Sequence, residues 1–263
     1  MKSFSLSLVQ LRPEPGRVDD NIGKHVDFIR AAAREGSALV VFPECSLTGY
    51  AAEGAGALAL SGDSEGIRAL EHECYVNQIA VCFGYLERRG EELQIAQELF
   101  SAGERIVYRK THLGSREEGV FRTGDEFPML TAPVSAGMQL CWESHIPEIS
   151  ALYRGRGAEL LLMPYASGMS GEKCRENWAV HLPARASDNG AWAAACNLLF
   201  PQGRAAGGGL ALYDPKGRLA AGYFGTEEHM LTCALSGPLP REIPAGDMHA
   251  ISYFDKTRRE LFR

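Results

Sequence analysis

Residues that can do chemistry follow three predicted strands of this 263-residue sequence. Glu44 comes after the apolar run "ALVVFP", Lys110 ends "RIVYRK", and Cys141 ends "GMQLC". A thiol becomes a working nucleophile when a carboxylate accepts its proton beside a cation that stabilises negative charge. The three residues therefore predict covalent catalysis, with Glu44 as base, Cys141 as nucleophile and Lys110 as the cation. The backbone N–H of Trp142 is predicted to help Lys110 stabilise an oxyanion.

Each of these residues also has an ordinary structural interpretation. Glu44 is equally placed to cap the turn that Pro43 begins. A cysteine that ends a buried strand is usually a core residue, and a lysine in the same position is usually solvated. Burial at the end of a strand would raise the pKa of Glu44 toward neutrality, because desolvation disfavours the charged carboxylate. Spacing alone leaves both interpretations open.

Hydrophobic periodicity predicts the elements that would position these residues. Strands are expected at 4–8, 38–42, 79–86, 93–100, 105–108, 138–141, 158–164, 191–196 and 209–214, and helices at 20–35, 64–78, 147–154 and 172–188. The pattern favours one domain over residues 1–263, with helices outside mostly buried strands and two sheets rather than one. Residues 236–263, which end in the basic stretch "KTRRELFR", are predicted to form a C-terminal tail that packs on the domain or on a partner subunit.

Composition excludes several classes of partner and location. The formal net charge of −6 argues against nucleic acid or an anionic membrane as the main partner. No apolar run reaches the roughly 18 residues needed to cross a bilayer, and the N-terminus lacks the core of a signal peptide, so a cytoplasmic location is expected. Seven cysteines, an odd number with no CxxC pair, indicate neither a disulfide framework nor a zinc site.

Longer motifs surround the three reactive residues. The stretches "FPECSLTGY", "YRKTHLGSREEGVFRTGDEF" and "MQLCWESHIPE" resemble the three signature blocks of the nitrilase superfamily, the carbon–nitrogen hydrolases. The likeness continues through "PARASDNGAWAAACNLLF" and "GGLALYDPKGRL", and so covers most of the chain in the expected order.

This resemblance implies an α/β fold, a four-layer α-β-β-α sandwich in which two stacked mixed sheets are flanked by helices. It implies a Glu-Lys-Cys triad on Glu44, Lys110 and Cys141. The second glutamate of the family precedes an F-x-x-G step by four residues, which assigns it to Glu117, with the adjacent Glu118 as the alternative. The resemblance implies no cofactor and no metal. It further implies a homodimer, or a higher homo-oligomer, that forms through the outer helices.

The reaction implied by the resemblance begins with attack by Cys141 on a small-molecule substrate. Ammonia or an amine leaves, and water activated by Glu44, with help from Glu117, hydrolyses the thioester. The "CWE" triplet resembles nitrile-cleaving members, but Ser144 stands where those have asparagine, so an amide or N-carbamoyl amine is favoured over a nitrile. An acyltransferase that passes the thioester to an amine stays open as an alternative. A non-catalytic binding protein on this fold would be expected to lack a triad residue, and none is lacking.

The residues that would contact substrate are less well determined. Those predicted to bind the oxyanion or substrate are Trp142, His145 and Tyr165. Ordinary core packing explains two further aromatic or apolar candidates equally well, Met169 and Trp178. An acidic substrate would require an arginine, and the candidates, each of which surface solvation also explains, are Arg116, Arg175 and Arg204.

Overall fold

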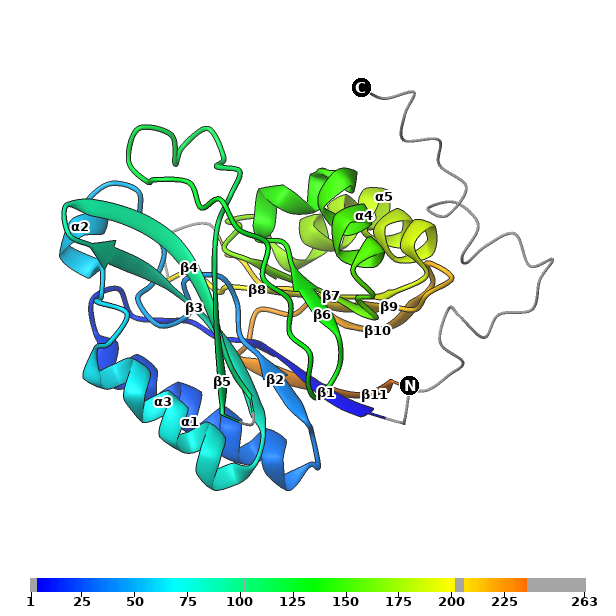
Figure 1. The fold of residues 1–263 in the computed structure, drawn as a ribbon, viewed down its shortest axis with the longest axis horizontal. Helices are drawn as coiled ribbons and strands as arrows, with labels where there is room; N and C mark the ends of the chain where they lie inside the picture. The colour runs from blue at the N-terminus through cyan, green and yellow to red at the C-terminus, as the bar shows by residue number, and fades with distance from the viewer. Residues whose placement is uncertain (1–3, 102, 202–205, 236–263) are drawn as a thin grey trace.

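Two β-sheets stack face to face between two pairs of helices (Figure 1). The computed structural model describes residues 4–101, 103–201 and 206–235. Within them, sheet A has the strand order β11-β1-β2-β3-β4-β5 and sheet B the order β10-β9-β8-β7-β6. The strands of sheet A are β1 (Phe4–Gln10), β2 (Leu39–Val41), β3 (Ala80–Arg89), β4 (Glu92–Ser101), β5 (Glu104–Arg109) and β11 (His229–Leu235). Those of sheet B are β6 (Ala136–Met138), β7 (Leu160–Tyr165), β8 (Trp192–Asn197), β9 (Leu210–Tyr213) and β10 (Leu219–Tyr223).

Helices cover the outer face of each sheet (Figure 1). On sheet A lie α1 (Val18–Arg34) and α3 (Glu65–Asn77), and on sheet B lie α4 (Pro147–Gly155) and α5 (Gly171–Asn189). A short α2 (Ala55–Leu58) and a 3-10 helix, η1 (Cys141–His145), complete the described elements. The four layers α-β-β-α confirm the fold class expected from the sequence.

Both sheets are mixed, and each is built around three parallel strands. In sheet A these are β1, β2 and β3, and in sheet B they are β6, β7 and β8. Strands such as β7, whose residues are all buried, are apolar throughout because one face packs on the helices and the other on the opposite sheet. Antiparallel strands extend both sheets; in sheet A, β4 pairs with β3 on one side and with β5 on the other. The carboxyl ends of the parallel strands therefore lead into the loops that carry the candidate site.

The apolar core forms two layers. One fills the space between the sheets and under α1 and α3, and contains residues such as Leu8, Val41 and Leu162. The other lies between sheet B and its helices and includes Tyr153 and Trp178. Since helices and sheets bury one face each, this layering is what fixes the two sheets against one another.

The structure corrects part of the sequence prediction. The strand expected at 138–141 ends at Met138, and Cys141 begins η1 instead of ending a strand. Two strands, β10 and β11, were not predicted, and β11 pairs with β1 across most of the chain, with Phe4 opposite Leu235. The proposed tail, residues 236–263, lies outside the described residues, and both the tail and the single-domain assignment stay predictions.

Candidate active site

Glu44 lies in a tight turn that follows β2 and is packed against β3. The N–H of Leu47 donates to the carbonyl of Gly84, 2.8 Å away, which fastens the turn to the sheet. Gly84 permits this close approach, since a Cβ there would collide with the backbone nitrogen of Cys45. The Glu44 side chain is thereby held inside the molecule, with 1 % of its surface exposed.

Lys110 follows β5 and carries the ammonium group at the centre of the site. Its Nζ lies 2.8 Å from Oε1 of Glu44 and 2.9 Å from Oε1 of Glu117, and its side chain is 1 % exposed. The second oxygen of Glu117 accepts a hydrogen bond from the N–H of Gly114, at 2.7 Å, within the loop after β5. Glu118 is exposed, so the structure places Glu117 of the two neighbouring glutamates against Lys110.

Cys141 is half-buried and begins η1 in an unusual backbone conformation. Its φ of 48° lies in the left-handed region that non-glycine residues rarely adopt. The Ser144 hydroxyl donates to the Cys141 carbonyl at 2.7 Å, and the Tyr165 hydroxyl donates to Ser144 at 2.6 Å. Strained residues persist where their surroundings hold them, and this conformation turns Cys141 out of the strand direction.

Burial and charge set the protonation of the site. Desolvation raises the pKa of Glu44 to about 7, against the favourable charge of Lys110. Desolvation, with the negative charge of Glu44, raises the pKa of the Cys141 thiol to about 12. Burial alone would lower the pKa of Lys110, but the surrounding acidic groups outweigh it and hold that pKa above its ordinary value. The resting site thus holds a neutral thiol beside a carboxylate that exchanges protons near neutral pH.

The backbone of sheet B also reaches the carboxylate. The N–H of Ala166, just after β7, donates to Oε2 of Glu44 at 3.0 Å, and the same N–H lowers the pKa of the Cys141 thiol. Both oxygens of Glu44 therefore have a donor, one from each sheet. A buried carboxylate with satisfied oxygens has a fixed orientation.

The remaining predicted residues fall into two groups. Trp142 is 52 % exposed beside Cys141, and its ring lies 5.1 Å from that of the exposed His145. These two side chains flank the site at the surface. Tyr165 is buried and its hydroxyl donates to Ser144, so it stabilises η1 from the interior of the molecule.

Other candidates lie away from the reactive groups or in ordinary packing. Trp178 is fully buried in the core, and Met169 packs against the same cluster. Arg116 and Arg175 are exposed, the latter 3.6 Å from Glu172. Arg204 lies outside the described residues.

Two side chains at the site were not singled out as participants by the sequence. The hydroxyl of Tyr50 lies 3.4 Å from Oε1 of Glu117, and this tyrosine ends the quoted motif "FPECSLTGY". Glu143 was treated only as a marker of substrate class, yet it is fully buried and accepts hydrogen bonds from the segments around both Lys110 and Cys141. The signal available for Glu143 was its place in the motif "MQLCWESHIPE", two residues after Cys141.

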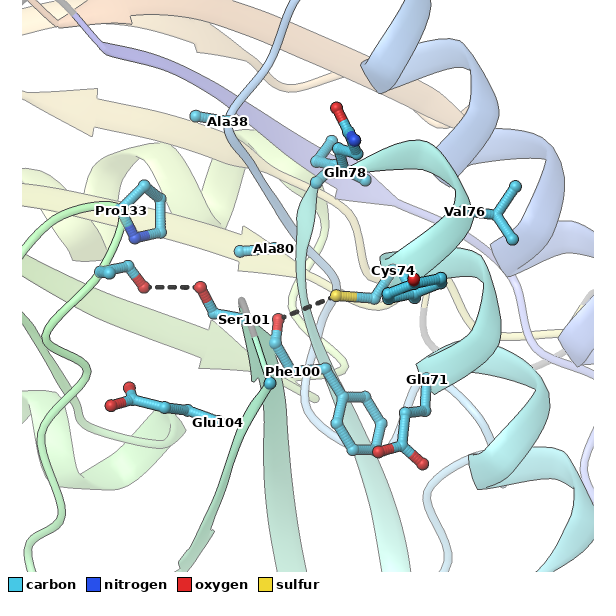
Figure 2. A pocket seen from close by; sticks show the side chains of 14 residues that line it. Ala38, Glu71, Cys74, Val76, Gln78, Ala80, Phe100, Ser101, Glu104 and Pro133 are labelled. Carbon is cyan, nitrogen blue, oxygen red and sulfur yellow. Dashed lines mark hydrogen bonds between the residues drawn. The ribbon is translucent and has the colours of Figure 1, made fainter.

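A cavity of about 800 Å³ lies elsewhere in the molecule, by the end of α3 (Figure 2). Its lining includes Cys74, Phe100 and Pro133, and it reaches Ala38 and Ala80 at the amino ends of the parallel strands. None of the triad residues lines it. The candidate site therefore rests on the hydrogen-bonded group at the opposite ends of these strands.

Neither a metal site nor a membrane-spanning helix is found among the described residues. Among them, no group of three or more His, Cys, Asp or Glu side chains is arranged to hold a metal ion. No helix within the same ranges has the length and apolar character needed to cross a membrane.

The fold and the site together define a class of enzyme that works through a thiol nucleophile. Comparison with known proteins makes the class specific: the chain belongs to the carbon-nitrogen hydrolase family, whose sequence model matches residues 5–241. The resemblance of the signature motifs to this family is confirmed, and the chain is a carbon–nitrogen hydrolase.

Curated relatives include both amidases and nitrilases. The hydrolase in the pqqF 5′ region of Pseudomonas protegens is 30 % identical over 206 residues, 75 % of this chain and 70 % of the relative. An aliphatic nitrilase of Sinorhizobium fredii is 27 % identical over 284 residues, 92 % of this chain and 89 % of the relative. The human omega-amidase is 27 % identical over 202 residues, 72 % of each chain.

Solved structures of an amidase from Nesterenkonia sp. AN1 share the fold. A cysteine-to-alanine mutant in complex with butyramide has a TM-score of 0.84 and 25 % identity, covering 99 % of this chain and 96 % of that one. A glutamate-to-glutamine mutant, with the acetamide moiety of fluoroacetamide added covalently at the active-site cysteine, has a TM-score of 0.84 and 25 % identity, covering 99 % and 95 %.

Proposed function

We propose that this enzyme hydrolyses the C–N bond of a small amide or N-carbamoyl amine through a thioester on Cys141. The observation that carries the proposal is the placement of Lys110 between Glu44 and Glu117, beside a neutral thiol. The amidase structures that share the fold, one of them with butyramide bound, support an amide as the substrate.

The first half-reaction forms the thioester. As Sγ of Cys141 bonds to the carbonyl carbon, its proton passes to the Glu44 carboxylate, whose pKa of about 7 suits exchange at neutral pH. The Lys110 ammonium and the Trp142 N–H stabilise the oxyanion. The proton then moves from Glu44 to the substrate nitrogen, the C–N bond breaks, and ammonia or an amine leaves.

The second half-reaction uses water. Glu44, again ionised, accepts a proton from a water molecule that attacks the thioester carbon. Glu117 helps to orient that water while it stays hydrogen-bonded to Lys110. The C–S bond breaks, the thiolate recovers the proton from Glu44, and a carboxylic acid leaves (a carbamic acid when the substrate is an N-carbamoyl amine).

The test is ammonia release from a panel of ω-amides, aliphatic amides, carbamoyl amines and nitriles, measured beside Cys141→Ala. Release from one class that disappears in the mutant supports the proposal and identifies the substrate class. Unchanged release in the mutant contradicts Cys141 as the nucleophile. Release from nitriles alone favours the alternative, a nitrilase.

Acyl transfer is separated from hydrolysis with an added nucleophile. With hydroxylamine present, a hydrolase partitions its thioester between acid and hydroxamate, whereas an acyltransferase releases little acid in water alone. The ratio of acid to ammonia without hydroxylamine therefore decides between the two, and a ratio near one supports hydrolysis.

The proposal extends to assembly as a homodimer or a higher homo-oligomer. Val180 on α5 exposes 81 % of its surface on the outer side of sheet B, an apolar side chain left open to contact. Sedimentation velocity at micromolar concentration tests this, and a monomer throughout would contradict it.

A further inference from the structure

Glu143 is a fully buried carboxylate that accepts hydrogen bonds from five donors. Oε1 accepts from the Thr111 N–H at 2.8 Å, the Thr111 hydroxyl at 2.6 Å and the His112 N–H at 3.0 Å. Oε2 accepts from the Leu140 N–H at 2.8 Å, and the Tyr108 hydroxyl lies 2.7 Å from both oxygens. Few buried side chains of this molecule are so densely engaged.

The donors belong to the two segments that carry the reactive groups. Thr111 and His112 directly follow Lys110, at the end of β5 in sheet A. Leu140 directly precedes Cys141, after β6 in sheet B. One carboxylate therefore fixes the backbone on both sides of the gap that the ammonium and the thiol face.

The charge of Glu143 is held by dipoles rather than by a close cation. The His112 imidazole lies near it, with Nδ1 3.8 Å from Oε1, but this side chain is 48 % exposed. An ionised acceptor strengthens each hydrogen bond that it receives. Its negative charge is also among the groups that raise the pKa of Glu44.

We propose that Glu143 is a positioning residue that sets the separation and orientation of Lys110 and Cys141. The inference rests on the proposed function, because it assigns those two residues to the reaction. The amide introduced by Glu143→Gln has one acceptor oxygen in place of two, and it would present an N–H₂ group to the N–H donors that now bind the carboxylate. The loss of even about 1 Å of alignment lowers a rate by roughly 100-fold.

The matched control is Glu98 on β4. Glu98 is also fully buried and accepts a hydrogen bond from a buried tyrosine, Tyr85, at 2.8 Å. It lies on the face of sheet A that points away from sheet B and from the candidate site. Glu143→Gln and Glu98→Gln therefore each replace a buried carboxylate that accepts a hydrogen bond from a tyrosine. Only the first touches the segments next to Lys110 and Cys141.

The experiment compares kcat, KM and thermal unfolding for both variants, with Cys141→Ala alongside. Glu143→Gln is expected to lower kcat roughly 100-fold with KM within about threefold. The acidic limb of its pH–rate profile should also move to lower pH, because the charge that helps to raise the pKa of Glu44 is removed. Glu98→Gln is expected to keep wild-type kcat. A folded Glu143→Gln with kcat within threefold of wild type overturns the proposal.

Thr111→Val keeps the inference testable if Glu143→Gln does not fold. It removes the hydroxyl donor to Glu143 and keeps the shape of the side chain and the backbone donor. A fall in kcat of roughly tenfold at unchanged KM supports the positioning role, and wild-type kcat overturns it. Activity that survives in Cys141→Ala would instead contradict the proposed function itself.

Discussion

Two groups of buried carboxylates lie on opposite faces of sheet A, and β5 together with the residue that follows it supplies the cations to both. On the face toward sheet B, Lys110 alone is shared by Glu44 and Glu117. On the other face, Arg105 pairs with Glu98 and Arg109 pairs with Glu87, so that each carboxylate has its own guanidinium. Alternation along the strand separates the two groups, since neighbouring residues point to opposite faces.

The difference shows how one strand serves both structure and chemistry. Arg109 contacts both oxygens of Glu87 through two nitrogens, a geometry in which the planar guanidinium fixes the orientation of the carboxylate. Lys110 lowers the pKa of Glu44, but burial outweighs it and, together with the charge of Glu117, raises that pKa to about 7. Burial also raises the pKa of Glu98, against its hydrogen bonds from Arg105 and Tyr85. The arginine pairs hold their carboxylates in place, whereas the group around Lys110 places a carboxylate of near-neutral pKa beside Cys141.

The largest change in activity is expected from Glu44→Gln. An amide cannot accept the thiol proton, so we expect kcat/KM to fall by about 10²–10⁴-fold. The substitution should also change the free energy of unfolding, by an amount that depends on pH. The folded-state pKa of about 7 lies above the ordinary value of about 4.5, so the unfolded chain ionises first and the stability contributed by Glu44 is lost as pH rises between those values.

Thermal unfolding at pH 5 and pH 8 checks this second effect. The free energy of unfolding of Glu44→Gln relative to wild type should be higher at pH 8 than at pH 5, by about 1–3 kcal/mol. A difference that is equal at both pH values would show that Glu44 titrates normally in the folded protein.

Lys110→Met should lower kcat/KM by about 100–1,000-fold, because it removes a charged donor to the oxyanion. It also leaves two buried carboxylates without a cation, and the expected loss of stability at pH 8 is about 3–5 kcal/mol. Urea unfolding should show a smaller loss at pH 5, where protonation relieves Glu44. Activity above one tenth of wild type would contradict the role given to the shared ammonium.

The pH dependence of the wild-type enzyme follows from Glu44. A protonated Glu44 cannot act as the base, so kcat/KM should fall roughly tenfold per pH unit below about 7. Circular dichroism over the same range separates this limb from acid unfolding. A flat profile from pH 5 to 8 in a folded protein would mean that Glu44 is not the base.

The smallest effect on activity is expected from a change in the group paired with arginine, on the face of sheet A away from sheet B. Glu98→Gln should leave kcat/KM within threefold of wild type and lower the free energy of unfolding by about 1–3 kcal/mol, because Arg105 and Tyr85 lose a buried partner. Steady-state kinetics and urea unfolding measure both. A large loss of activity would show that the two faces of sheet A are coupled.

The strand pattern predicted two sheets with helices outside, and the family resemblance predicted the four layers and the two carboxylates beside Lys110. Strands such as β7 are continuous apolar runs that only a doubly covered sheet accommodates. The residues now found within hydrogen-bonding distance of Lys110 occupy two long motifs, at Glu44 and Glu117, so their proximity could be expected from the family resemblance.

What the sequence did not predict depends on contacts between distant segments. β11 pairs with β1, more than 200 residues away, and the five residues of β10, "LAAGY", are exposed or only partly buried. The Cys141 carbonyl accepts a hydrogen bond from the nearby Ser144, but Ser144 is itself held by Tyr165 of another strand, β7. The contacts of Glu143 likewise become visible only once β5 and β6 are placed in different sheets.

The hydrogen bond from Ala166 to Glu44 joins the two sheets at the reactive centre. Glu44 and Lys110 follow strands of sheet A, whereas Cys141 and Ala166 follow strands of sheet B. The candidate site therefore lies at the interface between the two sheets, and neither sheet alone carries all of its residues. During denaturation, catalysis should stop as soon as the sheets slide apart, while the strands within each sheet still hold together.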